Sequence, residues 1–175
     1  MDQEELFTFD DQCIRHLVTS EIFPKNTVVR PFHPTTKADF SSKKWVCFPF
    51  YPFSIGFTFF FSPLVNEFFN VTKLAYPEVM PLLWRILFTF DRLNCTHSLD
   101  MTFSEIADVY ELRTYGTSHF TFRIKPGQYS LASKTKHKEN DWRTRFLFVR
   151  RDSIPNDQSL PIHWTRKVRV FQDPA

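Results

Sequence analysis

Glycine is scarce in this sequence, which contains 3 Gly among its 175 residues. Loops that cradle phosphate groups with backbone N–H groups are built from several closely spaced glycines. The chain therefore has almost no material for a nucleotide-binding loop of that kind. Its 12 Pro point instead to long irregular connections.

Cysteine is equally rare. The 3 Cys, at positions 13, 47 and 95, are odd in number and widely spaced, so they predict no disulfide framework and indicate a reducing compartment. The N-terminal segment MDQEELFTFDD lacks the basic stretch and apolar run of a secretory signal. We therefore expect an intracellular protein, located in the nucleus or the cytoplasm.

A stretch of 21 residues without a charge runs from Trp45 to Val65. Its length would suit a membrane helix, but Pro49, Pro52 and Gly56 argue against one, because each interior proline removes a backbone hydrogen bond and costs about 3 kcal/mol. We expect no membrane span. We predict an aromatic segment that crosses the core and is extended from Phe48 to Phe53.

Aromatic residues are abundant, with 22 Phe, 5 Tyr and 4 Trp. The stretch Met80–Leu93 is apolar on nearly every side, and a helix of that kind is normally buried in a core. It is the best candidate for a central helix, and it can begin at either Pro77 or Pro81, since proline suits a first helical turn.

Further helices are predicted on both sides of this stretch. The first lies within residues 4–19 and is followed by a short strand near Thr27–Val29. Ser62 and Pro63 form a good helix start, with Ser as the N-cap. Thr102 and Glu105 form a capping box, and the helix after them carries its apolar face from Ile106 through Tyr110, with Leu112 as a possible extension.

The period then changes from helical to alternating, which is typical of strands. Strands are predicted at Phe120–Ile124, at Tyr129–Leu131 after a Pro126-Gly127 turn, and at Trp142–Phe148. The polar segment 133–141 is predicted to be a loop. The predicted fold class is therefore α+β, with a helical middle packed on a small antiparallel sheet from the C-terminal third.

Basic residues are concentrated toward the C-terminus. The formal net charge is +3, but residues 123–169 contain 12 Lys and Arg against 4 Asp and Glu. One interpretation is a solvated face on half-buried strands. The other is nucleic-acid binding, in which basic side chains neutralise phosphates and Trp142 stacks on an unpaired base. The residues that would carry it are Lys134, Lys136, Lys138, Trp142, Arg143 and Arg145.

A second binding surface is conceivable at Phe57–Phe61. If these rings are exposed, they form an apolar patch that suits self-association or a protein partner. The alternative is that they complete the domain's own core.

No catalytic pattern stands out. The Asp-Thr/Ser-Gly tripeptide of aspartic proteases does not occur, and the only Asp-Asp pair lies at positions 10 and 11. A nuclease needs carboxylates around two metal ions. Four acids could supply such carboxylates, although acids in a helical region are more typical of a helix surface. They are Asp91, Asp100, Asp108 and Glu111.

Two partial zinc-ligand pairs are also present, Cys13 with His16 and Cys95 with His97. A core cysteine beside an incidental histidine is the commoner arrangement. We expect no enzyme activity, no metal, no cofactor and no small-molecule substrate.

The order of several motifs resembles a known family. They are FPFYPFSIGFTFFFSPLVNEFF, YPEVMPLLWRILFTFDRL, FSEIADVYELRTYGTSHFTFRIKPG, WRTRFLFVRRD and LPIHW. Together they resemble the plant gypsy-type transposon domain, a retrotransposon-derived family, over about residues 25–165. Residues 1–24 would then be an acidic, helical N-terminal segment and 166–175 a tail. Family members often have Pro at the position of Phe60, a departure that affects only the local backbone.

The resemblance implies an origin and no chemistry. It implies a non-enzymatic module of Gag-like origin that interacts with nucleic acid or protein, and it carries no catalytic residue onto this sequence. The alternative is a degenerate element fragment with no present activity.

Overall fold

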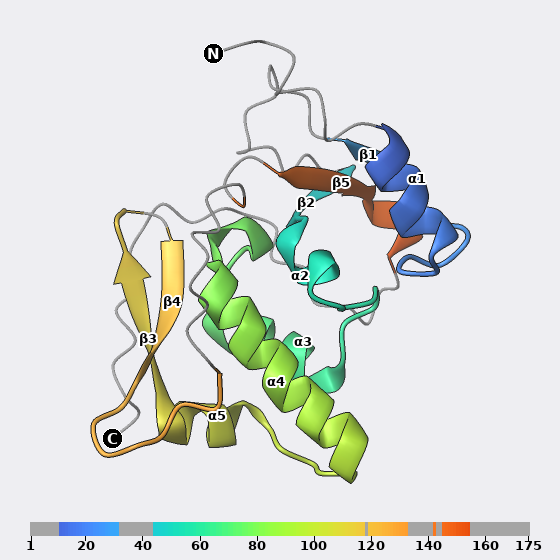
Figure 1. Cartoon of the computed structure of the whole chain (residues 1–175). Helices are drawn as coiled ribbons and strands as arrows, with labels where there is room; N and C mark the ends of the chain where they lie inside the picture. The colour runs from blue at the N-terminus through green and yellow to red at the C-terminus, as the bar shows by residue number, and fades with distance from the viewer. Residues whose placement is uncertain (1–10, 32–43, 118, 133–141, 143–144, 155–175) are drawn as a thin grey trace.

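The computed structural model of the chain describes residues 11–31, 44–117, 119–132, 142 and 145–154 (Figure 1). Within them the fold is α+β, as predicted. The helices are α1 (Asp11–Thr19), α2 (Tyr51–Ser54), α3 (Pro63–Thr72), α4 (Pro81–His97) and α5 (Phe103–Val109). The strands are β1 (Val29–Pro31), β2 (Trp45–Pro49), β3 (Tyr110–Tyr115), β4 (His119–Ile124) and β5 (Phe146–Arg150), and short 3-10 helices lie at η2 (Tyr76–Glu78) and η4 (Arg151–Ser153).

The strands form two sheets, which corrects the prediction of one sheet from the C-terminal third. One sheet has the order β1-β5-β2 and the other is the β3–β4 hairpin; all pairs are antiparallel. The reason lies in β5. Leu147 and Val149 face the main core, while Phe146 and Phe148 pack with Cys47 on the other side. A strand buried on both faces needs a central position, and the N-terminal strands β1 and β2 provide it.

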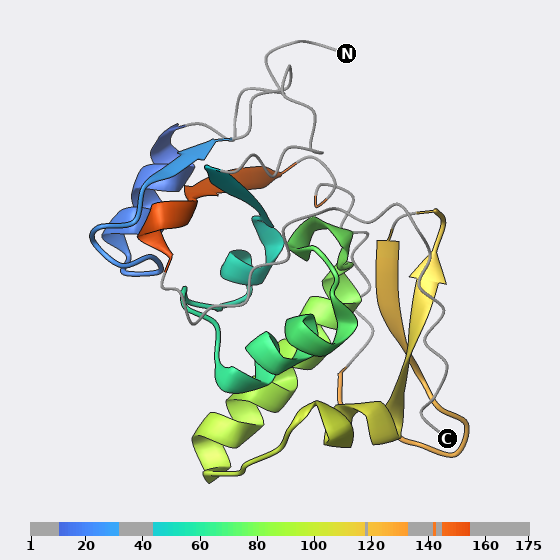
Figure 2. The same cartoon turned by 180° about the vertical axis from the view of Figure 1, so that it is seen from behind.

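Helix α4 lies at the centre of the molecule, with the β3–β4 hairpin on one side and α1 and α2 on the other (Figures 1 and 2). It begins at Pro81, while Pro77 lies in η2, so the question of its start is resolved. Trp84 is 0% exposed. Its ring lies 5.7 Å from those of Phe57 and Phe61 and 5.3 Å from that of Phe69, measured between centroids. The predicted central helix is confirmed.

The uncharged segment crosses the core as expected, but its backbone differs. Strand β2 ends at Pro49 and α2 follows, so the prediction of an extended chain as far as Phe53 was wrong. Pro52 lies in the first turn of α2, where its missing N–H would have no helical partner anyway.

The rings of the Phe57–Phe61 segment are largely buried. Phe57 and Phe61 are each 4% exposed and Phe59 is 6% exposed. They pack against one another and against Phe48, which comes from β2. These rings therefore complete the domain's own core, and the exposed patch that self-association through this segment requires is not there.

Both predicted helix starts are present. Ser62 accepts a hydrogen bond from the N–H of Val65 at the start of α3, and the capping box precedes α5. Helix α5 ends at Val109, however, so the predicted extension was wrong. Tyr110 and Leu112 belong to β3, because on a strand both side chains reach the apolar face that covers α4.

The strand predicted at Phe120–Ile124 is present as β4, and the strand predicted at Trp142–Phe148 is present in part as β5, which begins at Phe146. The strand predicted at Tyr129–Leu131 is not formed. In the 129–131 segment, the Leu131 N–H donates to the Tyr110 hydroxyl at 2.9 Å, and Tyr129 is 90% exposed. This backbone therefore bonds to a side chain instead of a neighbouring strand. Trp142 lies apart from β5. The 133–141 loop and the predicted tail boundary at 166 lie outside the described residues.

No helix in the described ranges combines the length and the apolar character needed to cross a membrane.

The enclosure of Trp84 generates the first prediction. The Trp84→Ala variant should lose about 3–5 kcal/mol of unfolding free energy, because a large ring in a fully packed site is replaced by a cavity. Urea denaturation followed by circular dichroism measures the loss. Tyr129→Ala removes a ring that is 90% exposed and is the matched control. Equal denaturation midpoints for the two variants would show that α4 is not the centre of the core.

Candidate functional site

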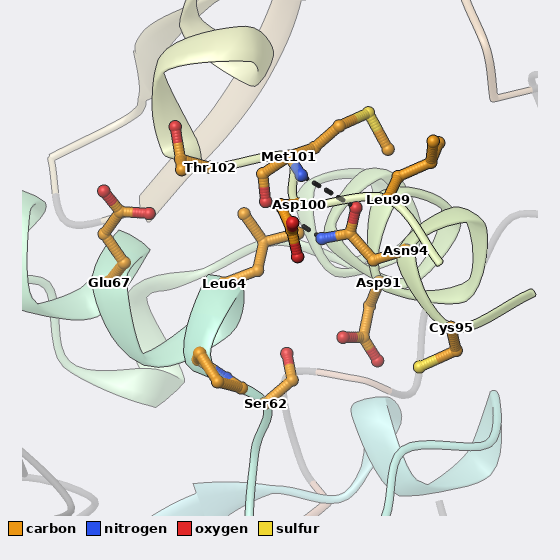
Figure 3. A pocket seen from close by; sticks show the side chains of 11 residues that line it. Ser62, Leu64, Glu67, Asp91, Asn94, Cys95, Leu99, Asp100, Met101 and Thr102 are labelled. Carbon is orange, nitrogen blue, oxygen red and sulfur yellow. Dashed lines mark hydrogen bonds between the residues drawn. The ribbon is translucent and has the colours of Figure 1, made fainter. Parts of the chain in front are cut away.

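One open pocket lies between the start of α3, the C-terminal half of α4 and the loop that leads into α5 (Figure 3). Its volume is about 560 Å³, and its lining includes three carboxylates and no basic side chain. The lining residues are Ser62, Pro63, Leu64, Glu67, Asp91, Asn94, Cys95, Leu99, Asp100, Met101 and Thr102.

Two of the polar side chains in this pocket serve the fold. The Asn94 amide donates to the Met101 carbonyl at 2.9 Å, and the Met101 N–H donates back to Asn94 Oδ1 at 3.0 Å. Glu67 Oε2 accepts the N–H of Phe103 at 2.9 Å. These bonds fix the loop against α4 and satisfy an N–H of the first turn of α5, which has no partner inside its own helix.

The four acids that the sequence offers for a nuclease do not come together. Asp91 and Asp100 line the pocket, whereas Asp108 lies on α5 and Glu111 on β3. In the part of the chain that the structure describes, no group of three or more His, Cys, Asp or Glu is placed to hold a metal ion. The pocket therefore presents negative charge without a metal-binding arrangement.

The described cysteines differ in environment. Cys47 is buried in the β1-β5-β2 sheet, and this burial raises the pKa of its thiol to about 12. A thiol with that pKa stays protonated at neutral pH and is a poor nucleophile. Cys95 is exposed at the pocket.

A second candidate surface is the side of the β3–β4 hairpin that faces away from α4. Because side chains alternate along a strand, six residues share this side. We call it the hairpin face: Glu111, Arg113, Tyr115, His119, Thr121 and Arg123. Tyr115 is 53% exposed, and the Arg113 and Arg123 side chains are 54% and 68% exposed.

One carboxylate organises the charges of the hairpin face. Glu111 Oε1 lies 2.7 Å from Arg113 Nη2 and 3.9 Å from Arg123 Nε. It holds Arg113 closely and Arg123 only loosely. Two guanidinium groups against one carboxylate leave the face with a net positive charge.

The predicted nucleic-acid residues fall unevenly on the structure. Arg145 is exposed just before β5, and Lys134, Lys136, Lys138 and Arg143 lie outside the described residues. Trp142 is 9% exposed, and its ring meets His119 edge to face at 5.1 Å. Little of this ring is open to stack on a base, so the alternative interpretation, that Trp142 packs against the domain, describes it better.

The candidate residues predicted from the sequence did not include Arg113, Tyr115 or Arg123. The signal was available, since Glu111, Arg113 and Tyr115 alternate with the apolar Tyr110 and Leu112. It was obscured because Tyr110 and Leu112 were assigned to the preceding helix.

Comparisons of the chain with protein-family models, with curated proteins and with solved structures find no match. The family resemblance therefore rests on the sequence motifs alone and stays a prediction.

The capping box beside the pocket has a measurable charge effect. The Thr102 hydroxyl and N–H both donate to Glu105 Oε2, at 2.7 and 2.6 Å, and hold the pKa of the Glu105 carboxyl below its usual range. Because the folded-state pKa is lowered, the stabilisation is present above the unfolded pKa of about 4.3 and is lost as the pH falls through the folded value.

We therefore expect Glu105→Gln to lower stability at pH 7 and to converge with the parent chain near pH 3, in urea denaturation across that range. Thr102→Ala should cost about 1 kcal/mol at pH 7, and less in the Glu105→Gln background because the two side chains share their bonds. A constant difference between parent and Glu105→Gln from pH 7 to pH 3 would contradict this assignment.

Proposed function

We propose that this chain is a non-enzymatic, retrotransposon-derived module of Gag-like origin that binds single-stranded nucleic acid inside the cell, in the nucleus or the cytoplasm. The observation that carries the proposal is the hairpin face, where two exposed arginines and an exposed tyrosine share one side of the two-stranded sheet. The basic segment that follows in sequence extends the same chemistry.

The two residue types perform different parts of the task. Arg113 and Arg123 supply guanidinium groups that pair with phosphate oxygens. Tyr115 supplies a ring on which an unpaired base can stack. This is the role that was predicted for Trp142 from the sequence. Exposed aromatic rings beside basic groups on a sheet surface are the usual platform for single strands.

Trp142, which lies within the basic segment of the sequence, contacts the hairpin face. Trp142 contacts His119, which is part of the hairpin face. Lys138 precedes Trp142 by four residues and Arg143 follows it directly. Lys134, Lys136 and Lys138 lie outside the described residues, so their part in the proposal rests on their charge and their place in the sequence.

The chemistry supports binding with little sequence preference. Guanidinium–phosphate pairs and ring stacking are available with every base, and the hairpin face carries no asparagine or glutamine for base edges. A degenerate fragment with no present activity remains the alternative, and it predicts no binding even at low salt.

Fluorescence anisotropy with labelled poly-U RNA and poly-dT DNA, repeated at several salt concentrations, tests the proposal. Binding should weaken steeply with salt, and each lost phosphate contact should reduce the log–log slope by about 0.7. Arg123→Ala and the joint replacement of Lys134, Lys136 and Lys138 by alanine should both flatten it. Tyr115→Ala should weaken binding by about 1–3 kcal/mol, while Tyr115→Phe should bind like the parent.

The matched control is Arg92→Ala, which removes an exposed arginine from α4, outside the hairpin face. It should leave the salt slope closer to that of the parent. Absence of binding at low salt, or equal losses for Arg92→Ala and Arg123→Ala, would overturn the proposed surface.

A further inference from the structure

Strand β3 forms one edge of the hairpin sheet, and among the described residues no strand pairs with that edge. The far edge of β4 is covered, because the Met80 N–H donates to the Phe120 carbonyl at 2.9 Å and Val79 forms a bridge with Phe120. On β3, by contrast, Arg113, Thr114 and Tyr115 are all exposed.

The hydrogen bonds of the hairpin show which backbone groups reach this edge. The Lys125 N–H donates to the Val109 carbonyl at 2.9 Å, which marks this pair as hydrogen-bonded. Hydrogen-bonded and non-hydrogen-bonded pairs alternate along an antiparallel ladder. Glu111, Arg113 and Tyr115 therefore bond to β4, and the N–H and C=O groups of Leu112 and Thr114 point to the free edge. In the described ranges these groups have no partner strand.

An open row of backbone donors and acceptors is a template for another strand. The side chains of β3 say which strand fits. Glu111 and Arg113 lie on the same face, two residues apart, with Leu112 between them. A strand with opposite charges placed symmetrically about one residue is complementary to an antiparallel copy of itself.

We propose that a second copy of this chain pairs with β3 along this edge, antiparallel and centred on Leu112. Leu112 then lies opposite the partner's Leu112, and each Glu111 lies opposite the partner's Arg113. The two Leu112 residues exchange a pair of N–H···O=C bonds. Each Thr114 N–H donates to the carbonyl of the partner's Tyr110, whose own N–H is already bonded to the Ile106 carbonyl.

Charge selects this register over its neighbours. A shift by one residue would place the charged side of one β3 on the same side of the sheet as the apolar side of the other β3. A pairing centred on Arg113 uses the same backbone groups but sets Arg113 directly against the partner's Arg113, and like charges directly opposite each other are unfavourable. The pairing centred on Leu112 instead gains two Glu–Arg pairs.

Helix α4 packs against β4. Helix α5 leads into the start of β3, and the arrowhead end of β3 lies on the far side of β4 from α4 (Figures 1 and 2). The product is a symmetric four-stranded sheet in the order β4-β3-β3-β4, with a self-complementary interface.

Light scattering after size exclusion tests the pairing without any nucleic acid present. The parent chain should shift, as its concentration rises, from its monomer mass of 20.9 kDa toward twice that value. Glu111→Lys and Arg113→Glu should each weaken the dimer by about tenfold or more, because two attractive pairs become two repulsive ones.

Mixing these two variants is the decisive step. The introduced lysine of one chain then faces the introduced glutamate of the other, and each remaining Arg113 faces the partner's Glu111. The mixture should form a one-to-one heterodimer although each variant alone stays monomeric. Rescue on mixing cannot come from the Glu111–Arg113 pair within one chain, since that pair stays broken in both variants.

Cysteine pairs determine the register in a background with Cys13 and Cys95 replaced by serine. Positions 111 and 113 would form a non-hydrogen-bonded pair with Cα atoms about 4.5 Å apart, which suits a disulfide. Glu111→Cys and Arg113→Cys chains should therefore cross-link when mixed, and neither should cross-link alone. A parent that stays monomeric at millimolar concentration, or an Arg113→Cys chain that cross-links to itself, would overturn the proposal.

Discussion

The structure depends on the enclosure of one indole ring by other rings. Trp84 reaches into a space bounded by Phe57 and Phe61 from the uncharged segment, Phe69 from α3 and Tyr76 from η2. These rings come from three parts of the chain: the uncharged segment, α3 and η2. Since aromatic pairs contribute about 0.5–1.5 kcal/mol beyond their buried area, this cluster fixes α3, α4 and the segment before them as one body.

The parts of the fold that could be predicted are those determined by residues close together in the sequence. The cap at Ser62, the capping box and the apolar helix α4 are local patterns, and each formed where the sequence placed it. The partner strands of β5 are not local. Residues 146–149 are all buried, but their sequence does not say that Val46 and Val29, more than 100 residues earlier in the chain, would lie beside them.

The boundary between α5 and β3 shows why the candidate site was harder to predict. Tyr110 suits the apolar face of a helix and equally the inner face of a strand. Only its pairing with Ile124, and the hydrogen bond that its hydroxyl accepts from the Leu131 N–H, decide for the strand. Once Tyr110 is on β3, the alternation along the strand turns Arg113 and Tyr115 outward. The resulting basic face does not correspond to any contiguous sequence motif.

Glu111 links the proposed binding surface to the proposed dimer. In the single chain its carboxylate faces both arginines, at 2.7 Å for Arg113 and 3.9 Å for Arg123. Pairing of two β3 strands would bring the partner's Arg113 to Glu111 and draw the carboxylate further from Arg123, which is already the more weakly held. Arg123 would then be freer to meet a phosphate, and a four-stranded sheet would present two such arginines and two Tyr115 rings on one surface. Nucleic-acid binding and self-association would therefore reinforce each other through the partner of one carboxylate.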